Sequence, residues 1–213
     1  MSLIFDALFG LGPVQSLDFA GRPVTFPVMG TRTRKLYPVV TALLLTVGNS
    51  LPAVAQSSVD EMLEALQSAE KAEAIRLTRD IERVWSQSGS TALDMLLRRG
   101  RDALEEQQPD IAIEHLTALI DHAPDFAEGW HARATAFYMK DLYGPALSDL
   151  EKALTLNPDN YNAMFGLGVM FQEFGDTVRA EQAFRQVLDL HPHHENATKA
   201  LERLKAEGIG RTL

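Results

Sequence analysis

The sequence predicts an all-α protein, an α-α superhelix built from three copies of one 34-residue helical hairpin. Three prolines, Pro124, Pro158 and Pro192, stand 34 residues apart. Small and large apolar residues recur at the same places between them. Within each half of a unit the apolar residues recur at steps of three and four, which is a helical period and not a strand period. Such an array places function on a shared surface rather than in a catalytic pocket.

Residues 29–55 have the order of features of a secretory signal peptide. A basic cluster at 32–35 precedes an apolar run at 36–47, and 53–55 is an Ala-Val-Ala cleavage pattern. The run is shorter than the ~20 apolar residues that span a bilayer. We therefore expect export to the periplasm with cleavage after Ala55. The alternatives are a buried core helix and an uncleaved anchor.

Residues 1–28 precede this segment, although signal peptides begin close to the initiating methionine. The stretch contains several glycines and prolines and no sustained hydrophobic period. We interpret it as a disordered extension or as the product of a start placed too early. In the second case Met29 is the true start.

Residues 56–90 predict an N-terminal helical pair, with helices at about Val59–Gln67 and Ala69–Ser86. The apolar positions follow helical steps, but the pair is too irregular to count as a fourth unit. We expect it to lean on the first unit and to cover the apolar edge of that unit. Trp85 is then a core residue.

The array occupies 91–207, with repeats at 93–126, 127–160 and 161–194 and a capping helix at 195–207. The capping helix is expected to end near Gly208 and to leave 208–213 as a tail. The eighth residue of each repeat is small, and we expect it to face an alanine of the second helix where the two helices cross. These residues are Gly100, Ala134 and Gly168, and the alanines are Ala112, Ala146 and Ala180.

Helix-breaking residues fall where the array needs turns. Gln108-Pro109, Gly144-Pro145 and Gly175-Asp176 are expected to separate the two helices of each repeat. Between repeats, Pro124-Asp125 and Pro158-Asp159 are expected to stop one helix and to cap the next through the aspartate.

This pattern resembles the tetratricopeptide repeat. The resemblance covers Leu93 to His194 and is strongest at 127–160, where seven residues fit: Trp130, Ala134, Phe137, Ala146, Leu150, Ala153 and Pro158. The whole chain is similar to short secreted bacterial tetratricopeptide proteins of unassigned role. That resemblance implies a location and an architecture, and it supplies no activity.

Composition excludes several functions. The chain has a net charge of −9, and without residues 1–55 it would have 27 acidic residues, 16 basic residues and a net charge of −11. This charge opposes binding to nucleic acid and to anionic lipid. The chain has no cysteine, hence no disulfide, thiolate nucleophile or thiolate metal site. Phosphate-loop, serine-hydrolase and zinc-protease motifs are missing as well, so we expect no enzyme and no cofactor.

The first helix of each repeat is expected to line a concave groove. We expect this groove to hold an extended peptide or a partner protein. An acidic group of that ligand is expected near Arg98 and Arg101. The protein itself is expected to be a monomer or a weak homo-oligomer. Chaperone-binding members of the family clamp a carboxylate with several lysines and asparagines, and these are missing at the corresponding places of this chain, so that specificity is not implied. The candidate partner-binding residues are Arg98, Arg101, His131, Thr135, Tyr138, Asn162, Phe165, Val169 and Gln172.

Two other functions stay open at this point. The turn from His191 to Glu195 contains three histidines and could serve a metal-handling or enzyme-accessory protein. No second cluster of ligands completes a metal site, so we expect an exposed turn instead and assign no metal residue. The chain could also be a structural protein that associates with itself through an uncovered end of the array.

Overall fold

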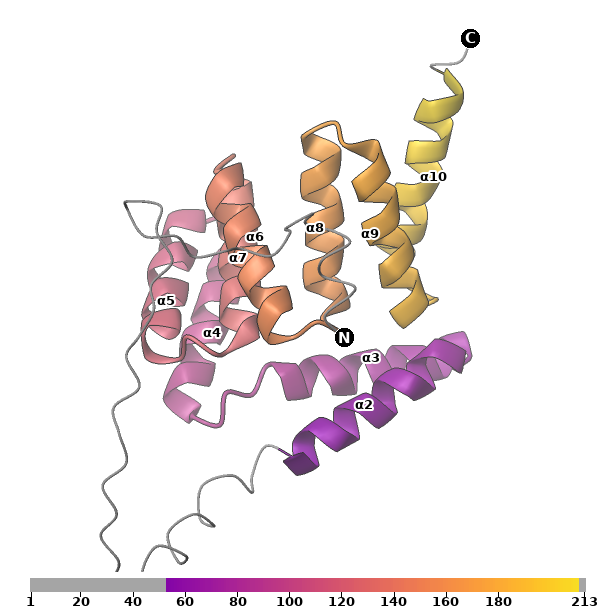
Figure 1. The fold of residues 1–213 in the computed structure, drawn as a ribbon. Coiled ribbons are helices and arrows are strands. Elements are labelled where there is room, and N and C mark those ends of the chain that lie inside the picture. The colour runs from indigo at the N-terminus through magenta and orange to yellow at the C-terminus, as the bar shows by residue number, and fades with distance from the viewer. Residues whose placement is uncertain (1–52, 211–213) are drawn as a thin grey trace, which may run out of the picture. The chain divides into compact units, whose positions relative to one another are not determined.

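A computed structural model describes residues 53–210 (Figure 1). The predicted extension at 1–28, the predicted signal peptide up to residue 52 and the last three residues of the predicted tail lie outside the described residues. Within them, the all-α prediction is confirmed, because the chain forms consecutive helical hairpins. No helix in the described part has both the length and the apolar character that a membrane span requires.

The helices follow one another as antiparallel pairs. The first pair is α2 (Ala53–Ser68) and α3 (Lys71–Trp85). The three repeats and the last helix follow: α4 (Thr91–Glu105) with α5 (Pro109–His122), α6 (Ala127–Met139) with α7 (Tyr143–Leu156), α8 (Tyr161–Glu173) with α9 (Thr177–Leu190), and α10 (Glu195–Gly210).

The turns inside the three repeats share one backbone conformation. Gln107, Asp141 and Gly175 stand 34 residues apart and have φ angles of 59°, 58° and 74°. In each turn the next amide donates to the carbonyl oxygen five residues back, at 2.8 to 2.9 Å, which closes the end of the first helix. Gly144-Pro145 was therefore wrongly predicted as a turn. These two residues lie in the first turn of α7 because Asp141 supplies the left-handed residue instead.

The close crossings occur at the predicted small residues but against different partners. A Cβ atom on Gly100 would lie 2.5 Å from Leu116, and one on Gly168 would lie 2.5 Å from Phe184. Each glycine thus faces the large residue that stands four places after the expected alanine. Ala134 takes the same place in the middle repeat and is buried.

The caps between repeats lie one residue later than predicted. Asn160 and not Asp159 caps α8, since its side chain accepts an amide N–H of the first turn at 3.0 Å. At α6 the N-cap residue is Phe126, which makes no side-chain cap, so Asp125 does not cap either. His194 caps α10 through Nδ1 at 3.1 Å. The side chain two places after the repeat proline therefore decides whether the N-terminus of the next helix is capped.

The N-terminal pair extends farther along the array than the sequence predicts. Helix α3 runs across the lower ends of the array helices and reaches the third repeat and α10 (Figure 1). Trp85 is only half-buried and packs against Tyr161 of α8 at 5.0 Å between ring centroids. The pair meets the first repeat at Ser86, as predicted, but it also extends across the third repeat and α10, where its partners are residues that the 34-residue period does not mark.

The last helix is longer than predicted. It runs from Glu195 to Gly210 and does not stop near Gly208. The start of α10 continues the array, with Ala197, Ala200 and Leu201 buried.

Candidate functional site

A cavity of about 270 Å³ lies between the first helices of the second and third repeats, α6 and α8. Six of the nine predicted groove residues line it. It is also lined by Ala134, Leu150, Gly166 and Met170, which the sequence analysis did not assign to it. The six are His131, Thr135, Tyr138, Asn162, Phe165 and Val169.

Two aromatic side chains supply most of the apolar wall, and both are held in place. Phe165 packs against Phe184 at 5.4 Å and against His194 at 5.2 Å between ring centroids. The Tyr138 hydroxyl donates to Glu173 at 3.1 Å. Partial burial and this carboxylate raise the pKa of Tyr138, so the hydroxyl stays protonated at neutral pH. A rigid, mostly neutral wall of this kind suits an apolar side chain.

His131 at the cavity is oriented by a buried carboxylate. Glu128 lies one helical turn before it, and His131 Nδ1 is 3.4 Å from Glu128 Oε1. Arg101 forms an ion pair with the same carboxylate, and Asn160 donates to it at 2.9 Å. Burial raises the pKa of Glu128, but His131, Arg101 and Asn160 outweigh it and lower the pKa to about 2. The charged carboxylate draws the Nδ1 side of the imidazole, so Nε2 is the nitrogen left for a ligand.

Asn162 is oriented from outside the repeats. Its amide nitrogen donates to Glu82 Oε1 of α3 at 2.8 Å. An ionised carboxylate only accepts hydrogen bonds, so this contact fixes which end of the amide is the nitrogen. Asn162 also lines the cavity. Sequence reasoning placed Asn162 in the groove but had no signal for Glu82.

A wider hollow of about 630 Å³ continues the cavity onto α10, and Phe165 lines both. Two cations, Lys199 and Arg203, lie in this second hollow together with Asn196, Glu202 and Ala206. The sequence contained a signal for them. Adding one repeat length of 34 to the predicted groove positions of α8 gives Asn196, Lys199, Arg203 and Ala206. We call the cavity and this hollow together the groove.

Three predicted groove residues do not line the cavity with the other six. Arg101 contacts Glu128 and the Ser86 hydroxyl, the latter at 2.8 Å. Arg98 is exposed on α4, and Gln172 is half-buried on α8. Neither of them lines the groove described above. The cationic end of the groove is therefore at α10 and not at the first repeat.

The side chains of the turn from His191 to Glu195 do not converge on a metal site. No group of three or more His, Cys, Asp or Glu side chains suited to a metal occurs within residues 53–210. His191 Nε2 is 3.0 Å from the Thr78 hydroxyl, and His193 Nε2 is 3.0 Å from a backbone carbonyl oxygen. Glu195 pairs with Lys71. Of the three histidines, His191 is buried, which corrects the expectation of an exposed turn.

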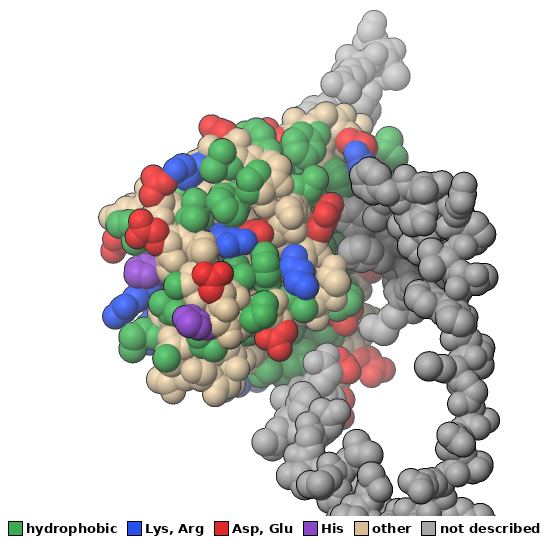
Figure 2. All heavy atoms as spheres, turned by 60° about the vertical axis from the view of Figure 1, so that its left-hand side comes forward, with side chains coloured by type: hydrophobic (Ala, Val, Ile, Leu, Met, Phe, Trp, Pro, Cys, Tyr) green, Lys and Arg blue, Asp and Glu red, His purple; other side chains and the backbone are tan. Residues whose placement is uncertain are grey.

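The face on the α5 side of the array has no dominant charge. Figure 2 shows acidic, basic and hydrophobic side chains interspersed over it. A surface of this composition offers no single-sign field to steer a polyanion or a polycation.

Comparison with known proteins gives one family. The tetratricopeptide repeat model matches residues 97–144 and 142–195. A TPR repeat-containing protein of Rhizobium etli is 28% identical over 161 residues, which are 73% of this chain and 79% of that protein.

Solved structures give the same fold. The Arabidopsis OM64 TPR domain is 26% identical, with a TM-score of 0.52, over 54% of this chain and 95% of that domain. The first TPR of Spaghetti (RPAP3), solved bound to the HSP90 peptide SRMEEVD, is 23% identical with a TM-score of 0.52. The match covers 55% of this chain and 93% of that chain.

Proposed function

Because this chain is a tetratricopeptide repeat protein, we propose that it is a non-enzymatic binding module that holds an extended peptide or a segment of a partner protein in its groove. The observation that carries this proposal is the cavity between α6 and α8, because six residues chosen by register alone line it. A related fold was solved with a bound peptide. That likeness is one of fold and does not indicate which peptide this chain binds.

The lining indicates the chemistry of the ligand. An apolar side chain fits between Tyr138 and Phe165, where burial of apolar surface supplies affinity. Asn162 and His131 offer polar atoms for the backbone of an extended segment. Lys199 and Arg203 favour an acidic residue at the α10 end, although Glu202 beside them reduces the local positive charge.

Two threonines provide a matched test. Thr135 lines the cavity, whereas Thr155 of α7 does not. Both are exposed, and both donate their hydroxyl to the carbonyl oxygen four residues earlier. A photo-crosslinking amino acid at position 135 should capture a discrete partner in intact cells, and the same probe at position 155 should not. The captured band should disappear when Tyr138→Ala and Phe165→Ala are added, with the helical content of the array retained.

Equal capture from positions 135 and 155 would show that the groove does not select a partner. The same conclusion would follow if the Tyr138→Ala and Phe165→Ala changes left the captured band unchanged. Light scattering on the purified chain tests the alternative of self-association, because a concentration-dependent mass would indicate that the partner is a second copy.

We also propose that the protein works in the periplasm after export by the segment 29–55. The order of basic, apolar and small residues supports this. Cell fractionation followed by N-terminal mapping of the mature chain is the test, and a first residue at Gln56 is expected. A mature cytosolic protein that still contains residues 36–47 would contradict export.

A further inference from the structure

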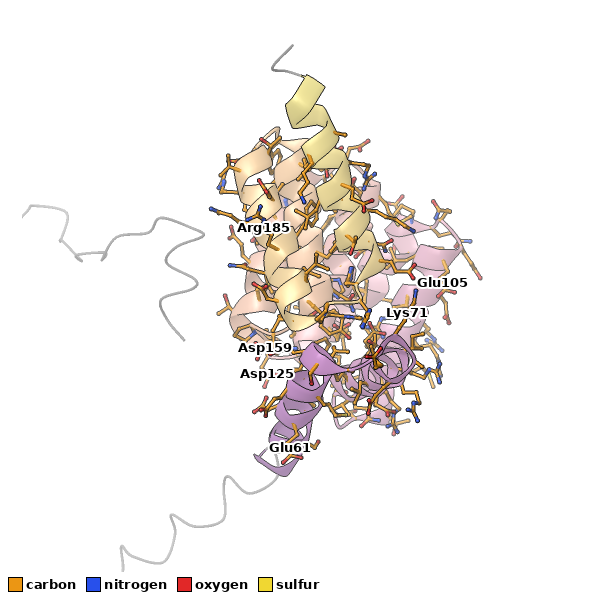
Figure 3. All side chains as sticks on the ribbon, turned by 90° about the vertical axis from the view of Figure 1, so that its right-hand side faces the viewer. Glu61, Lys71, Glu105, Asp125, Asp159 and Arg185 are labelled. Carbon is orange, nitrogen blue, oxygen red and sulfur yellow. The ribbon has the colours of Figure 1, made fainter. Side chains whose placement is uncertain are left out.

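Helix α3 is attached to the array from one end to the other. The Ser86 hydroxyl, just after α3, accepts from Arg101 of the first repeat at 2.8 Å. Farther along, Glu82 accepts from Asn162 of α8. At the opposite end, Lys71 pairs with Glu195 of α10 at 2.9 Å, and Figure 3 shows Lys71 beside the lower end of that helix. We call α2 and α3 together the strap.

The strap covers a buried histidine. His191, at the end of α9, is 8% exposed and lies between Thr78 of α3 and the ring of Tyr161 at 5.2 Å. Its Nε2 is at hydrogen-bond distance from the Thr78 hydroxyl, but its Nδ1 is buried without a partner. An imidazolium needs an acceptor for both N–H groups. In the docked state a protonated His191 would bury a charged donor that has no well-formed acceptor, and burial outweighs the partial support of its own backbone.

Protonation of the neighbouring His194 is disfavoured in the docked state as well. His194 Nδ1 accepts the first-turn amide of α10, so protonating this nitrogen would place two donors against each other. The rings of His191 and His194 are 5.5 Å apart between centroids, so charging both adds repulsion. Both rings also contact Tyr161, whose hydroxyl is buried without a partner.

We propose that the strap is an acid-released clamp: protonation of His191 and His194 detaches α2–α3 from the lower ends of the array helices while the three repeats stay folded. Release breaks the contact between Glu82 and Asn162, so Asn162 in the groove loses its fixed orientation. The inference goes beyond the proposed binding function, because it concerns the docking of α2–α3 and needs no ligand to test.

The charged groups around the cluster do not cancel this effect. On α3, Glu82 faces His194 and raises its pKa, and Lys71 is occupied by Glu195 of α10. On the turn itself, His193 and His194 disfavour a charge on His191. On α8, Tyr161 carries no charge, because burial and Glu82 raise its pKa. Thr78 and Phe165 are neutral.

These surroundings determine in which direction pH changes the stability of the docked strap. Burial, followed by His194 and His193, lowers the pKa of His191 from 6.5 to about 4, and burial lowers that of His194. A histidine with a lowered pKa in the docked state stabilises docking above pH 6.5, and this stability is lost as the pH falls toward 4. His191 alone should raise the opening equilibrium constant of the strap about 20-fold between pH 7 and pH 5.

Hydrogen exchange of the full-length chain, read by mass spectrometry as protection factors at pH 7 and pH 5, is the test. Peptides from α2 and α3 should lose protection at pH 5 by about 20-fold or more, while peptides from α6 to α8 keep theirs. The fluorescence of Trp85 in a Trp130→Phe background should report the same opening, because Trp85 packs against Tyr161.

The chain contains its own control for the histidines. The preceding turn has Asn157 and Asn160 where the third turn has His191 and His194, and Asn160 caps α8 just as His194 caps α10. The double variant His191→Asn with His194→Asn keeps a capping side chain and removes both titrating groups. It should abolish the change in protection between pH 7 and pH 5. The exposed His122→Asn should leave that change intact.

Two results would overturn the proposal. One is loss of protection in α6 to α8 together with α2 and α3, because the strap would then not open separately. The other is an unchanged acid response in the double asparagine variant, because the titrating groups would then lie elsewhere.

Discussion

The repeat array and the strap are both made of helical hairpins, but they are held by different kinds of contact. In the array the same apolar contact occurs again two repeat lengths later, as with Leu116 against Gly100 and Phe184 against Gly168. The strap buries apolar residues such as Leu66 and Ile81, and it also contacts the array through polar and aromatic pairs that occur once, such as Thr78 with His191. A periodic contact can be found from sequence spacing, whereas a contact made once cannot.

The largest expected effect tests the periodic contact. Phe184→Ala removes a side chain with no exposed surface that packs against Gly168 and Phe165. It should lower the free energy of unfolding by about 3–5 kcal/mol, measured by urea denaturation. Val178→Ala on the same helix, where the side chain is 66% exposed, should change it by less than about 0.5 kcal/mol. Similar losses for both variants would contradict the assignment of Phe184 to the core.

A smaller effect is expected at the buried carboxylate that links the repeats. Glu128→Gln keeps the shape but removes the charge that Arg101 and Asn160 contact. A loss of about 1–3 kcal/mol is expected. Because the pKa of Glu128 is lowered to about 2, its charge stabilises the fold above pH 4.5, and this stability is lost as the pH falls toward 2.

Denaturation curves recorded between pH 5 and pH 2 check this second effect. The gap between wild type and Glu128→Gln should narrow as the pH falls. A constant gap would mean that the carboxylate acts through packing and not through its charge.

Two glycines near the turns of the array are expected to respond to substitution in opposite directions. Gly175 has a φ of 74° with open space around it, so Gly175→Ala should destabilise the protein by about 1 kcal/mol through backbone strain alone. Gly144 also has open space but lies in the first turn of α7 without a positive φ. Gly144→Ala should stabilise by about 0.5–1 kcal/mol. Thermal denaturation followed by circular dichroism measures both, and shifts of the same sign would refute the turn assignment.

The smallest effect is expected at the exposed end of the strap. The side chains of Lys71 and Glu195 are 65% and 62% exposed, so solvent screens their ion pair. Lys71→Ala should change the free energy of unfolding by less than about 0.5 kcal/mol, and should leave the protection factors of α3 at pH 7 nearly unchanged. A large loss of protection would show that the ion pair, and not the buried contacts of His191 and Tyr161, holds the strap.

Sequence reasoning found most of the groove because the groove follows the repeat. His131, Thr135 and Tyr138 of α6 and the matching residues of α8 were chosen by register, and the structure brings them around one cavity. The same register carried one unit further would have found Lys199 and Arg203. For Arg101 the register did not show the ion pair with Glu128, because spacing places a side chain on a face but does not show which side chains lie within reach of it.

The amino-acid order by itself determined the helices, their pairing and the face of each first helix, because these features depend on neighbours at fixed short separations along the chain. Only the tertiary structure decided where α3 docks and which cations stay available. These outcomes depend on contacts between residues far apart in sequence, such as Thr78 with His191 and Lys71 with Glu195, and no local period encodes them.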